Sequence, residues 1–442
     1  MSGYTDGIDA ELRRRTMRKV SRRLIPFMIA MFCANFIDRV NIGFAALQMN
    51  RDLGLTPEIY GFAAGILFIG YTAFEVPSNI ILDKVGARLW LARIMVTWGL
   101  IAAANALVFD KYSLYVARTI LGIAEAGFFP GIMLYLIRWF PSEERAGAIT
   151  LFMVGNPISV IFGAPISTAI LGMDGTLGLH GWQWLFILEG VPAVVLGIIA
   201  YLWLTERPSE AAWLQPEERD WLTWRIASET QGTRSHALGG VWAAFTHGPT
   251  LLLAFAKFCV LLAFFGITLW LPQIIKGMGN LTNFETGVVT AIPYIFAAVA
   301  SIYIGRSSDR TGERAWHVAI PAFVGTLGFA LAAYTANPVI GMIGISIATA
   351  GLWVSNTVVW TMPAAILAGT PAAASGIALV NSIGNLGGFF GPYFTGWLRQ
   401  LTNSFSTSLL MLAGFLVLNG IVVLIVGRAI PPARRLEAPA LR

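Results

Sequence analysis

Seven ionisable residues lie inside long apolar stretches of this sequence, where a charge is costly. They are Asp38, Arg39, Glu75, Arg118, Glu125, Glu189 and Lys257. An ionisable side chain inside a membrane helix costs roughly 2.5–3.5 kcal/mol on insertion scales, so it is functional by default. The residue types indicate two kinds of chemistry, because guanidinium and ammonium groups bind carboxylates and buried carboxyl groups carry protons.

Spacing places four of these groups within reach of one site. Arg118 and Glu125 are seven residues apart, about two turns or ~10 Å along one helix face. Asp38 and Arg39 are adjacent and point ~100° apart, so one can face a cavity while the other reaches a neighbouring helix. Tyr71 adds a hydroxyl on an aromatic ring. The alternative is a set of internal salt bridges, but buried ion pairs are poor stabilisers. For Glu75, which is followed by Pro77, we expect a role in local packing or a gate. For Glu189, beside Gly190 and Pro192, we expect no direct contact with substrate.

The elements that must position these residues are membrane helices. Of 442 residues, 56% are hydrophobic and only 12% charged, about half the usual charged share, and the mean hydropathy is +0.68. A hydrocarbon core about 30 Å thick needs roughly 20 apolar residues per helix. Such windows predict twelve spans, near residues 24–46, 60–82, 89–109, 113–137, 146–171, 184–204, 250–275, 286–305, 316–336, 339–366, 374–398 and 404–428.

Most of the 30 Lys and Arg residues lie on one side of these spans. The two tails and the even-numbered loops hold nearly all of them, whereas the odd-numbered loops hold only Arg51, Lys111, Lys276 and Arg399. The positive-inside rule therefore places both termini in the cytoplasm. These charges are scattered over loops, whereas nucleic-acid binding would need one basic face. We expect no nucleic-acid partner.

Cysteine and histidine give no sign of disulfide or metal chemistry. Cys33 and Cys259 both lie in apolar spans, so a disulfide framework is not expected. The four histidines are scattered, and no HExxH or CxxC motif occurs. We expect no metal and no cofactor.

The two halves of the sequence are related by an offset of 226 residues, which brings Leu55-Thr56 onto Leu281-Thr282 and Cys33 onto Cys259. The halves therefore cross the membrane in the same direction, as a parallel repeat. A polar linker with a helix start signal at Pro216 separates them. The expected regions are a cytoplasmic tail (1–23), an N-terminal six-helix bundle (24–204), a cytoplasmic linker (205–249), a C-terminal six-helix bundle (250–428) and a cytoplasmic C-terminal tail (429–442).

Two short turns match under this offset and share the pattern Asp-x-x-Gly-x-Arg. The glycine allows a tight turn, and the aspartate can pair with a nearby basic residue or cap a neighbouring helix. We expect these residues to serve architecture and gating rather than substrate binding. They are Asp83, Gly86 and Arg88 in the first turn, and Asp309, Gly312 and Arg314 in the second.

The ionisable residues inside the spans, by contrast, have no charged match in the other half. Asp38 and Arg39 correspond to phenylalanines, Arg118 and Glu125 to glycines, and Lys257 to a methionine. Residues shared by the halves serve the fold, so the unmatched charges are the candidates for function. Lys257 can act as a second cation facing Arg39 across a cleft, or it can snorkel towards a membrane face.

Several strings resemble the anion:cation symporter family of the major facilitator superfamily, and the matched turns resemble the signature loop of that superfamily. The first glycine of the signature is present as Gly305 in the second copy but is Asn79 in the first. The resemblance covers nearly the whole chain apart from the tails and linker. The strings are Asn35-Phe36-Ile37-Asp38-Arg39-Val40-Asn41, Phe74-Glu75-Val76-Pro77-Ser78-Asn79, Arg118-Thr119-Ile120-Leu121-Gly122-Ile123-Ala124-Glu125-Ala126 and Trp184-Leu185-Phe186-Ile187-Leu188-Glu189-Gly190.

This resemblance implies an all-α membrane protein of twelve transmembrane helices in two six-helix bundles, the major facilitator fold. It implies a monomer in the bacterial cytoplasmic (inner) membrane that imports an organic anion with protons by alternating access, not an enzyme. By the same resemblance Arg39 binds the substrate carboxylate, Asp38 and Glu125 carry protons, and Tyr71 touches the substrate. The matching polar side chains of the fifth, tenth and eleventh spans are Asn156, Trp360 and Asn381, with Asn385 as a further candidate.

We add Arg118 and Lys257 to the substrate-binding candidates, because a second cation suits a substrate with two carboxylates. A dicarboxylate of the tartrate or phthalate type is therefore favoured over a sugar acid of the aldonate or aldarate type. Import of an anion against a negative-inside potential costs about 2.3 kcal/mol per charge per 100 mV, which protons can offset. The rivals are a proton-driven exporter, for which the stretch from Gly155 to Pro165 is a loose match, and a membrane enzyme or receptor, for which no catalytic constellation is present.

Overall fold

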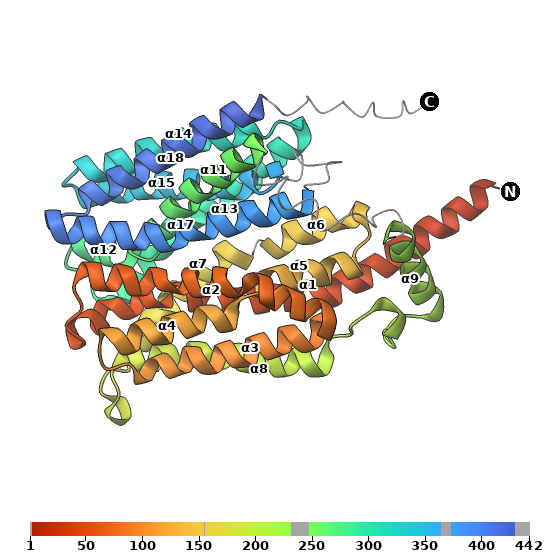
Figure 1. Cartoon of the computed structure of the whole chain (residues 1–442), viewed down its shortest axis with the longest axis horizontal. Helices are drawn as coiled ribbons and strands as arrows, with labels where there is room; N and C mark the ends of the chain where they lie inside the picture. The colour runs from red at the N-terminus through yellow and green to blue at the C-terminus, as the bar shows by residue number, and fades with distance from the viewer. Residues whose placement is uncertain (1, 154, 231–246, 364–372, 429–442) are drawn as a thin grey trace. The chain divides into compact units, whose positions relative to one another are not determined.

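The computed structural model describes residues 2–153, 155–230, 247–363 and 373–428, and the long elements in these ranges are all α-helices (Figure 1). The first part of the chain forms α1 (Ser2–Asp52), α2 (Pro57–Val85), α3 (Ala87–Ala104), α4 (Lys111–Glu125), α5 (Phe128–Trp139), α6 (Ser142–Met153), α7 (Gly155–Leu171), α8 (Gly181–Trp203) and α9 (Pro216–Thr230). The second part forms α11 (Gly248–Thr268), α12 (Leu271–Met278), α13 (Asn283–Thr311), α14 (Ala315–Tyr334), α15 (Pro338–Val359), α17 (Ala373–Thr402) and α18 (Ser406–Gly427).

Eleven helical segments among the described residues are long and apolar enough to cross a membrane. The place of the predicted span over 374–398 is taken by a further helix, α17, which is 30 residues long and carries Asn381, Asn385 and several glycines. Together these helices account for the twelve predicted spans, with ends that differ from the predicted ones by a few residues.

Among the described residues, two of the predicted spans consist of two consecutive named helices with a break between them. In the span over 113–137, α4 ends at Glu125 and α5 begins at Phe128, because Gly127 between them has a φ of 89° in the left-handed region that glycine tolerates. In the span over 250–275, α11 ends at Thr268 and α12 begins at Leu271, with a proline in its first turn. The first break makes Glu125 the last residue of α4.

The chain divides into two units. Unit 1 comprises Met1–Leu55, Ile66–Ser235 and Leu281–Ala291, and unit 2 comprises Thr56–Gly65, His236–Asn280 and Ile292–Arg442. The repeat-related helices α2 and α13 therefore each begin in one unit and continue in the other. We describe each unit by itself.

Glycines allow α3 and α8 of unit 1 to pack closely. A Cβ added to Gly190 of α8 would lie 2.6 Å from the carbonyl oxygen of Gly99 of α3, so only glycine permits this approach. Helix α1 packs against α7 and α8. This packing fixes the rotation of α8 and thereby the direction of the residue that precedes Gly190, Glu189.

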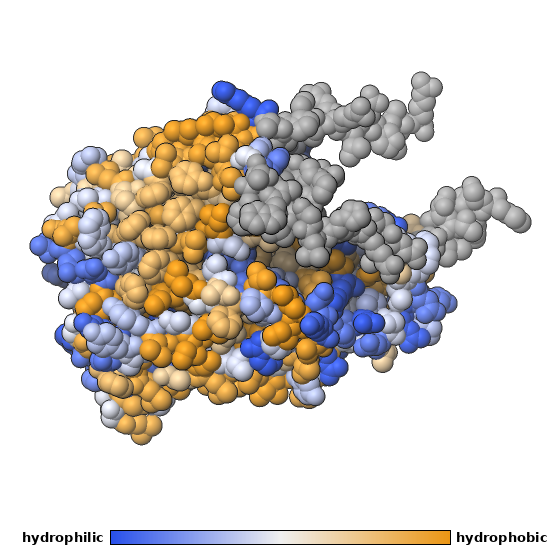
Figure 2. All heavy atoms as spheres, viewed as in Figure 1, coloured by the Kyte–Doolittle hydropathy of each residue, from blue (hydrophilic) through white to orange (hydrophobic). Residues whose placement is uncertain are grey.

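Large apolar side chains cover the outward faces of the helices in both units (Figure 2). Leu100 of α3, Val195 of α8 and Leu327 of α14 are examples, with 58%, 47% and 69% of their surface exposed. A surface of this kind suits contact with lipid, because the helices satisfy their own backbone hydrogen bonds.

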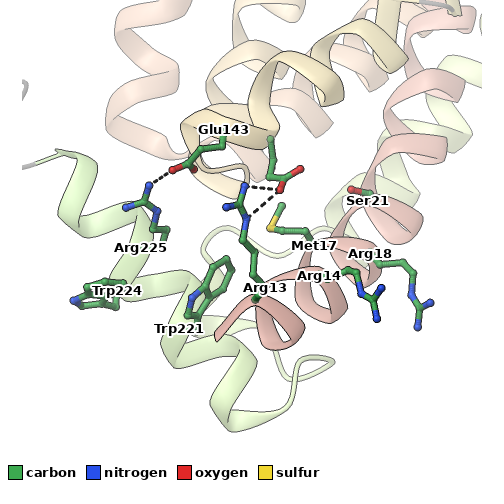
Figure 3. A pocket seen from close by; sticks show the side chains of 11 residues that line it. Arg13, Arg14, Met17, Arg18, Ser21, Glu143, Trp221, Trp224 and Arg225 are labelled. Atoms are coloured by element: carbon green, nitrogen blue, oxygen red, sulfur yellow. Dashed lines mark hydrogen bonds and ion pairs between the residues drawn. The ribbon is translucent and has the colours of Figure 1, made fainter. Parts of the chain in front are cut away.

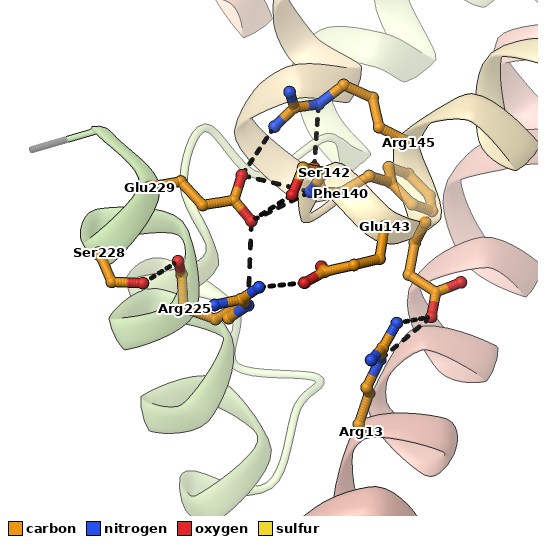
Figure 4. Close-up of polar contacts among 9 residues, drawn as sticks. Arg13, Phe140, Ser142, Glu143, Arg145, Arg225, Ser228 and Glu229 are labelled. Atoms are coloured by element: carbon orange, nitrogen blue, oxygen red, sulfur yellow. Dashed lines mark hydrogen bonds and ion pairs between the residues drawn. The ribbon is translucent and has the colours of Figure 1, made fainter. Parts of the chain in front are cut away.

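Ion pairs join α9, the helix that begins at the predicted start signal Pro216, to α1 and α6 (Figure 4). Arg225 of α9 pairs with Glu143 of α6, and Arg13 of α1 pairs with Glu144 at 2.8 Å. Glu229 accepts hydrogen bonds from the backbone N–H of Ser142 at 3.0 Å and from Arg145 at 3.2 Å. Two turns further along α1, Lys19 pairs with Glu218 at 2.8 Å.

Candidate functional site

The predicted charges of α1 and α4 meet in the interior of unit 1. Arg39 donates a hydrogen bond from Nε to Oε1 of Glu125, and Asn35 donates to the same oxygen at 2.6 Å. The Glu125 side chain is 0% exposed, and that of Arg39 is 15% exposed. The break in the helix after Glu125 thus ends α4 at the point where α1 supplies a guanidinium and an amide.

Asp38 is not hydrogen-bonded to this pair and has its own partner. Its Oδ1 accepts a hydrogen bond from Asn41 at 3.2 Å, and the charges of Glu125, Arg118 and Arg39 all act on its carboxylate. Asp38, Arg118 and Glu125 are all buried. The expected divergence of the adjacent Asp38 and Arg39 is therefore found, and the arginine, not the aspartate, is the residue that pairs with Glu125.

Aromatic side chains of α2 cover Arg39. The guanidinium carbon lies 4.8 Å from the ring centroid of Tyr71 and 6.0 Å from that of Phe68. Tyr71, predicted to touch the substrate, is thus placed beside the predicted carboxylate-binding residue. A cation over an aromatic face keeps its orientation while its edge stays free to bind an anion.

Arg39 and Glu125 form an ion pair, as the alternative of an internal salt bridge predicts. The pair nevertheless leaves nearby polar atoms without a hydrogen-bond partner. Within the described residues, Arg39 Nη2, Glu125 Oε2 and Asp38 Oδ2 are buried without a hydrogen-bond partner. A buried unmet polar atom costs about 1–3 kcal/mol. The cluster therefore has capacity for another ligand or a proton.

The structure does not connect every predicted residue of unit 1 to this cluster. Asn156 lies on α7, where its neighbour Gly155 packs against α1 and accepts a hydrogen bond from the Cys33 thiol at 3.4 Å. The side-chain oxygen of Asn156, Oδ1, has no hydrogen-bond partner among the described residues. Sequence reasoning missed Asn35 and Asn41, although their spacing of three residues on either side of Asp38 puts them on its face of the helix.

Lys257 in unit 2 is held in the interior. It is 1% exposed, and its Nζ donates a hydrogen bond to Asn356 at 2.8 Å and lies 4.3 Å from the ring centroid of Trp360. The alternative in which Lys257 snorkels to a membrane face is therefore wrong. Trp360, a predicted site residue, is one of its partners, whereas Asn356 was not foreseen.

Helix α17 carries the remaining candidates of unit 2. A Cβ on Gly384 would lie 2.5 Å from Cγ of Lys257, so α17 passes directly beside the lysine stem. Asn381 and Asn385 stand on either side of that glycine in the sequence, and both have interactions within the structure.

The two matched turns are each stabilised within their own unit. In the first turn Gly86 has a φ of 100°, Asp83 lies 3.5 Å from Arg138, and Arg88 donates to the carbonyl oxygen of Tyr201 at 2.8 Å. A carboxylate from the linker, Glu206, accepts the backbone N–H groups that begin α3 at 2.9 and 2.8 Å.

In the second turn Gly312 has a φ of 70°, and Asp309 pairs with Arg314 at 2.6 Å. Here the helix cap is local, because Glu313 accepts the backbone N–H of Trp316 at 2.8 Å. Burial alone would raise the pKa of Glu313, but the hydrogen bonds from Trp316 and His317 lower it below its ordinary value.

A cavity of about 620 Å³ lies between α1, α6 and α9, away from these residues (Figure 3). Its wall includes Arg14 and Arg18 of α1 and Trp221 and Trp224 of α9. None of the predicted site residues lines it. We therefore assign this cavity to the packing of the linker helix. Among the described residues, no group of three or more His, Cys, Asp and Glu side chains is arranged to hold a metal ion.

Comparisons with known proteins place this geometry in context. A family model described as the Major Facilitator Superfamily matches residues 27–392. An Agrobacterium vitis protein named "Putative tartrate transporter" is 46% identical over 425 residues, which cover 96% of this chain and 94% of that protein. An Acinetobacter baumannii protein named "Quinolone resistance transporter" is 38% identical over 413 residues, which cover 93% of this chain and 95% of that protein.

Among solved structures, a bacterial homologue of the human lysosomal transporter Spinster, in an inward-facing and unoccupied conformation, matches with a TM-score of 0.77. The match covers 93% of this chain and 98% of that chain at 16% identity. At this identity the likeness shows the fold alone.

Proposed function

We propose that this chain, which belongs to the Major Facilitator Superfamily, imports an organic carboxylate anion together with protons. Its family and fold are those of multi-pass membrane transporters and not of enzymes, as the sequence predicted. In our proposal the protein is a monomer in the bacterial cytoplasmic membrane, has both termini in the cytoplasm, and works by alternating access.

The observation that carries the proposal is the pairing of Arg39 with Glu125. A guanidinium that binds the protein's own carboxylate can bind a substrate carboxylate in the same way, because both are planar two-oxygen acceptors. Protonation of Glu125 weakens its hold on Arg39 and releases the guanidinium for the substrate. Proton binding and anion binding are then linked through one side chain.

Charge balance within the cluster of Asp38, Arg39, Arg118 and Glu125 favours the same coupling. Asp38 and Glu125 offset Arg39 and Arg118, so the four-residue cluster is neutral when all are ionised. An added carboxylate leaves one uncompensated negative charge in a buried environment, which is costly. A proton on Glu125 or Asp38 restores neutrality.

The substrate class we propose is a dicarboxylate of the tartrate or phthalate type. The proposal is supported by a second buried cation besides Arg39, namely Lys257, whose ammonium group is held by Asn356 and Trp360. The relative at 46% identity carries tartrate in its name. A sugar acid is the alternative within the same mechanism.

A second candidate function, proton-driven export, is favoured by the relative named for quinolone resistance. A drug of that class is larger and more apolar than a small dicarboxylate. Direction of transport and substrate charge therefore separate the two functions.

The test is uptake of labelled tartrate, phthalate, galactonate and glucarate into proteoliposomes under an inward proton gradient. We expect accumulation of at least one dicarboxylate, and its loss when the gradient is collapsed by a protonophore. Gradient-independent uptake would overturn the coupling, and transport of a fluoroquinolone without any organic acid would establish the exporter.

A further inference from the structure

A second line of polar side chains in unit 1 lies apart from Arg39 and Glu125, on the side of α1 that packs against α7 and α8. On α1 it consists of Asp38, Asn41, Gln48 and Asp52, whose spacing of three, seven and four residues puts them on one helix face. The line runs ~21 Å along the axis to the end of α1, and Arg39 points ~160° away from Asn41 around the helix.

At the end of α1 this line reaches solvent. Asp52 accepts a hydrogen bond from the indole N–H of Trp182 at 3.2 Å and lies 3.4 Å from Nδ1 of His180. His180 in turn lies 3.6 Å from Asp174. The side chains of His180 and Asp174 are 55% and 49% exposed, so this cluster exchanges protons with water directly.

Glu189 of α8 lies between this surface cluster and Asp38. Its Oε1 accepts a hydrogen bond from Ser167 of α7 at 2.5 Å, it also interacts with the amide of Asn41, and the charge of Asp38 acts on it. It is 7% exposed. Sequence analysis predicts no direct substrate contact for Glu189, and its partners place it beside a proposed proton carrier.

Each buried side chain of the line has one oxygen that receives no hydrogen bond from the described residues. They are Asp38 Oδ2, Asn41 Oδ1, Gln48 Oε1 and Glu189 Oε2. Architectural networks in proteins satisfy nearly all buried polar atoms. All four atoms are hydrogen-bond acceptors, so each can accept a hydrogen bond from water, and the carboxylate oxygens can also bind a proton.

We propose that this line conducts protons from the extracytoplasmic surface to Asp38, with Glu189 as the relay. The proposal rests on the proton coupling proposed above. A proton from water at the Asp52–His180 cluster binds the Glu189 carboxylate and then passes through water to the Asp38 carboxylate. Only the proton moves, and Glu189 returns to its ionised form. Asn41 and Ser167 are positioning residues that orient the Glu189 carboxyl.

The route explains how a proton reaches Asp38 without crossing the substrate-binding side of α1. Asp38 lies where the line ends, and the next residue, Arg39, points ~100° further around the helix towards Glu125. Asp38 is thus the residue at which the proton line meets the anion-binding side of α1.

The experiment measures proton influx with an internal pH dye in proteoliposomes on addition of external tartrate, or of galactonate if only that is carried. We expect Glu189→Gln to reduce substrate-driven proton influx at least tenfold while counterflow exchange of labelled substrate stays within twofold of the wild type. The matched control is Ser159→Ala, a buried serine on α7 whose hydroxyl donates to the carbonyl oxygen of Gly155 and interacts with the Cys33 thiol, not with the line. It should change neither rate more than twofold.

Proton influx of Glu189→Gln within twofold of the wild type would overturn the relay. If Glu189→Gln also loses exchange, Glu189→Asp is the deciding variant. The relay predicts that this shorter titratable side chain restores at least a third of the wild-type proton influx. Normal exchange in Glu189→Asp with less proton influx than this would reject the relay. Absence of substrate-driven proton influx in the wild type would instead overturn the proposed symport itself.

Discussion

Two buried polar sites, one in each unit, differ in how fully their hydrogen-bonding atoms are satisfied. In unit 2, Asn419 is fully buried and satisfied, since its amide donates to the carbonyl oxygen of Ala256 at 3.0 Å and accepts from Ser355 at 2.8 Å. In unit 1, Asp38 and Glu125 are as deeply buried but each keeps an oxygen without a partner among the described residues. The difference separates polar groups that join helices from polar groups that await a ligand.

The same comparison applies to charge. Within the described membrane helices, unit 1 buries both acids and arginines close together, whereas unit 2 buries Lys257 among an amide and an indole ring. A cluster of opposite charges can change its net charge by binding a proton, while Lys257 attracts an anion only in its protonated form. We therefore assign coupling to unit 1 and a share of substrate selectivity to unit 2.

The largest expected effect is at Arg39. Arg39→Lys keeps the charge but loses the two-pronged guanidinium, so we expect substrate uptake to fall about 100-fold, equivalent to ~3 kcal/mol. Arg93→Lys on α3, an arginine over Trp90 outside the cluster, is the control and should stay within twofold. Initial rates of substrate uptake in proteoliposomes measure the effect of each variant. Equal losses for Arg39→Lys and Arg93→Lys would show that Arg39 has no special role in substrate binding.

The next effect concerns the acids of unit 1. Glu125→Gln and Asp38→Asn remove a titratable group at nearly constant shape, so accumulation against a gradient should disappear while counterflow exchange persists in part. Labelled-substrate accumulation and exchange in the same proteoliposomes separate the two activities. Normal accumulation in either variant would remove the proposed role of unit 1 in coupling.

Lys257→Gln tests the role given to unit 2. The loss of one charge-assisted contact should weaken dicarboxylate binding about tenfold or more, and monocarboxylate binding less than threefold. Competition of unlabelled phthalate and galactonate against labelled substrate gives both values. Equal weakening of the two would show that Lys257 does not select for the second carboxylate.

Asn419→Ala should affect stability rather than transport. The change leaves the carbonyl of Ala256 and the hydroxyl of Ser355 without their buried partner, which costs roughly 1–3 kcal/mol. We expect a lower melting temperature in detergent with the substrate affinity unchanged. A transport defect larger than the stability loss would contradict the assignment of Asn419 to architecture.

The smallest expected effect is a pH dependence of the linker. Burial alone would raise the pKa of Glu218, but hydrogen bonds from Lys19 and the Gln215 N–H and the charges of Lys19 and Arg15 lower it below its ordinary 4.5. A lowered pKa stabilises the folded state above about pH 4.5, and that stabilisation disappears as the pH falls through the folded pKa. The melting-temperature difference between the wild type and Glu218→Gln should therefore be present at pH 7 and shrink progressively as the pH is lowered below 4.5.

Much of this molecule follows from local sequence properties. Apolar runs of membrane length predict the helices, because the bilayer requires every span to satisfy its own backbone hydrogen bonds. The repeat separates Asp83 and Asp309, which recur and stabilise turns, from Asp38 and Lys257, which do not recur. The breaks at Gly127 and before Pro272 also have local signals, which a search for apolar windows alone passes over.

The amino-acid sequence alone identifies the residues that are costly to bury and that therefore require a functional explanation. Their partners become visible only in the folded chain: Arg39 pairs with Glu125 across 86 residues, Lys257 with Asn356 across 99, and Glu189 joins Asp38 through Asn41. These pairings depend on the rotation and depth of each helix relative to its neighbours. Those are set by close contacts such as Gly99 against Gly190, not by the periodicity of any single helix.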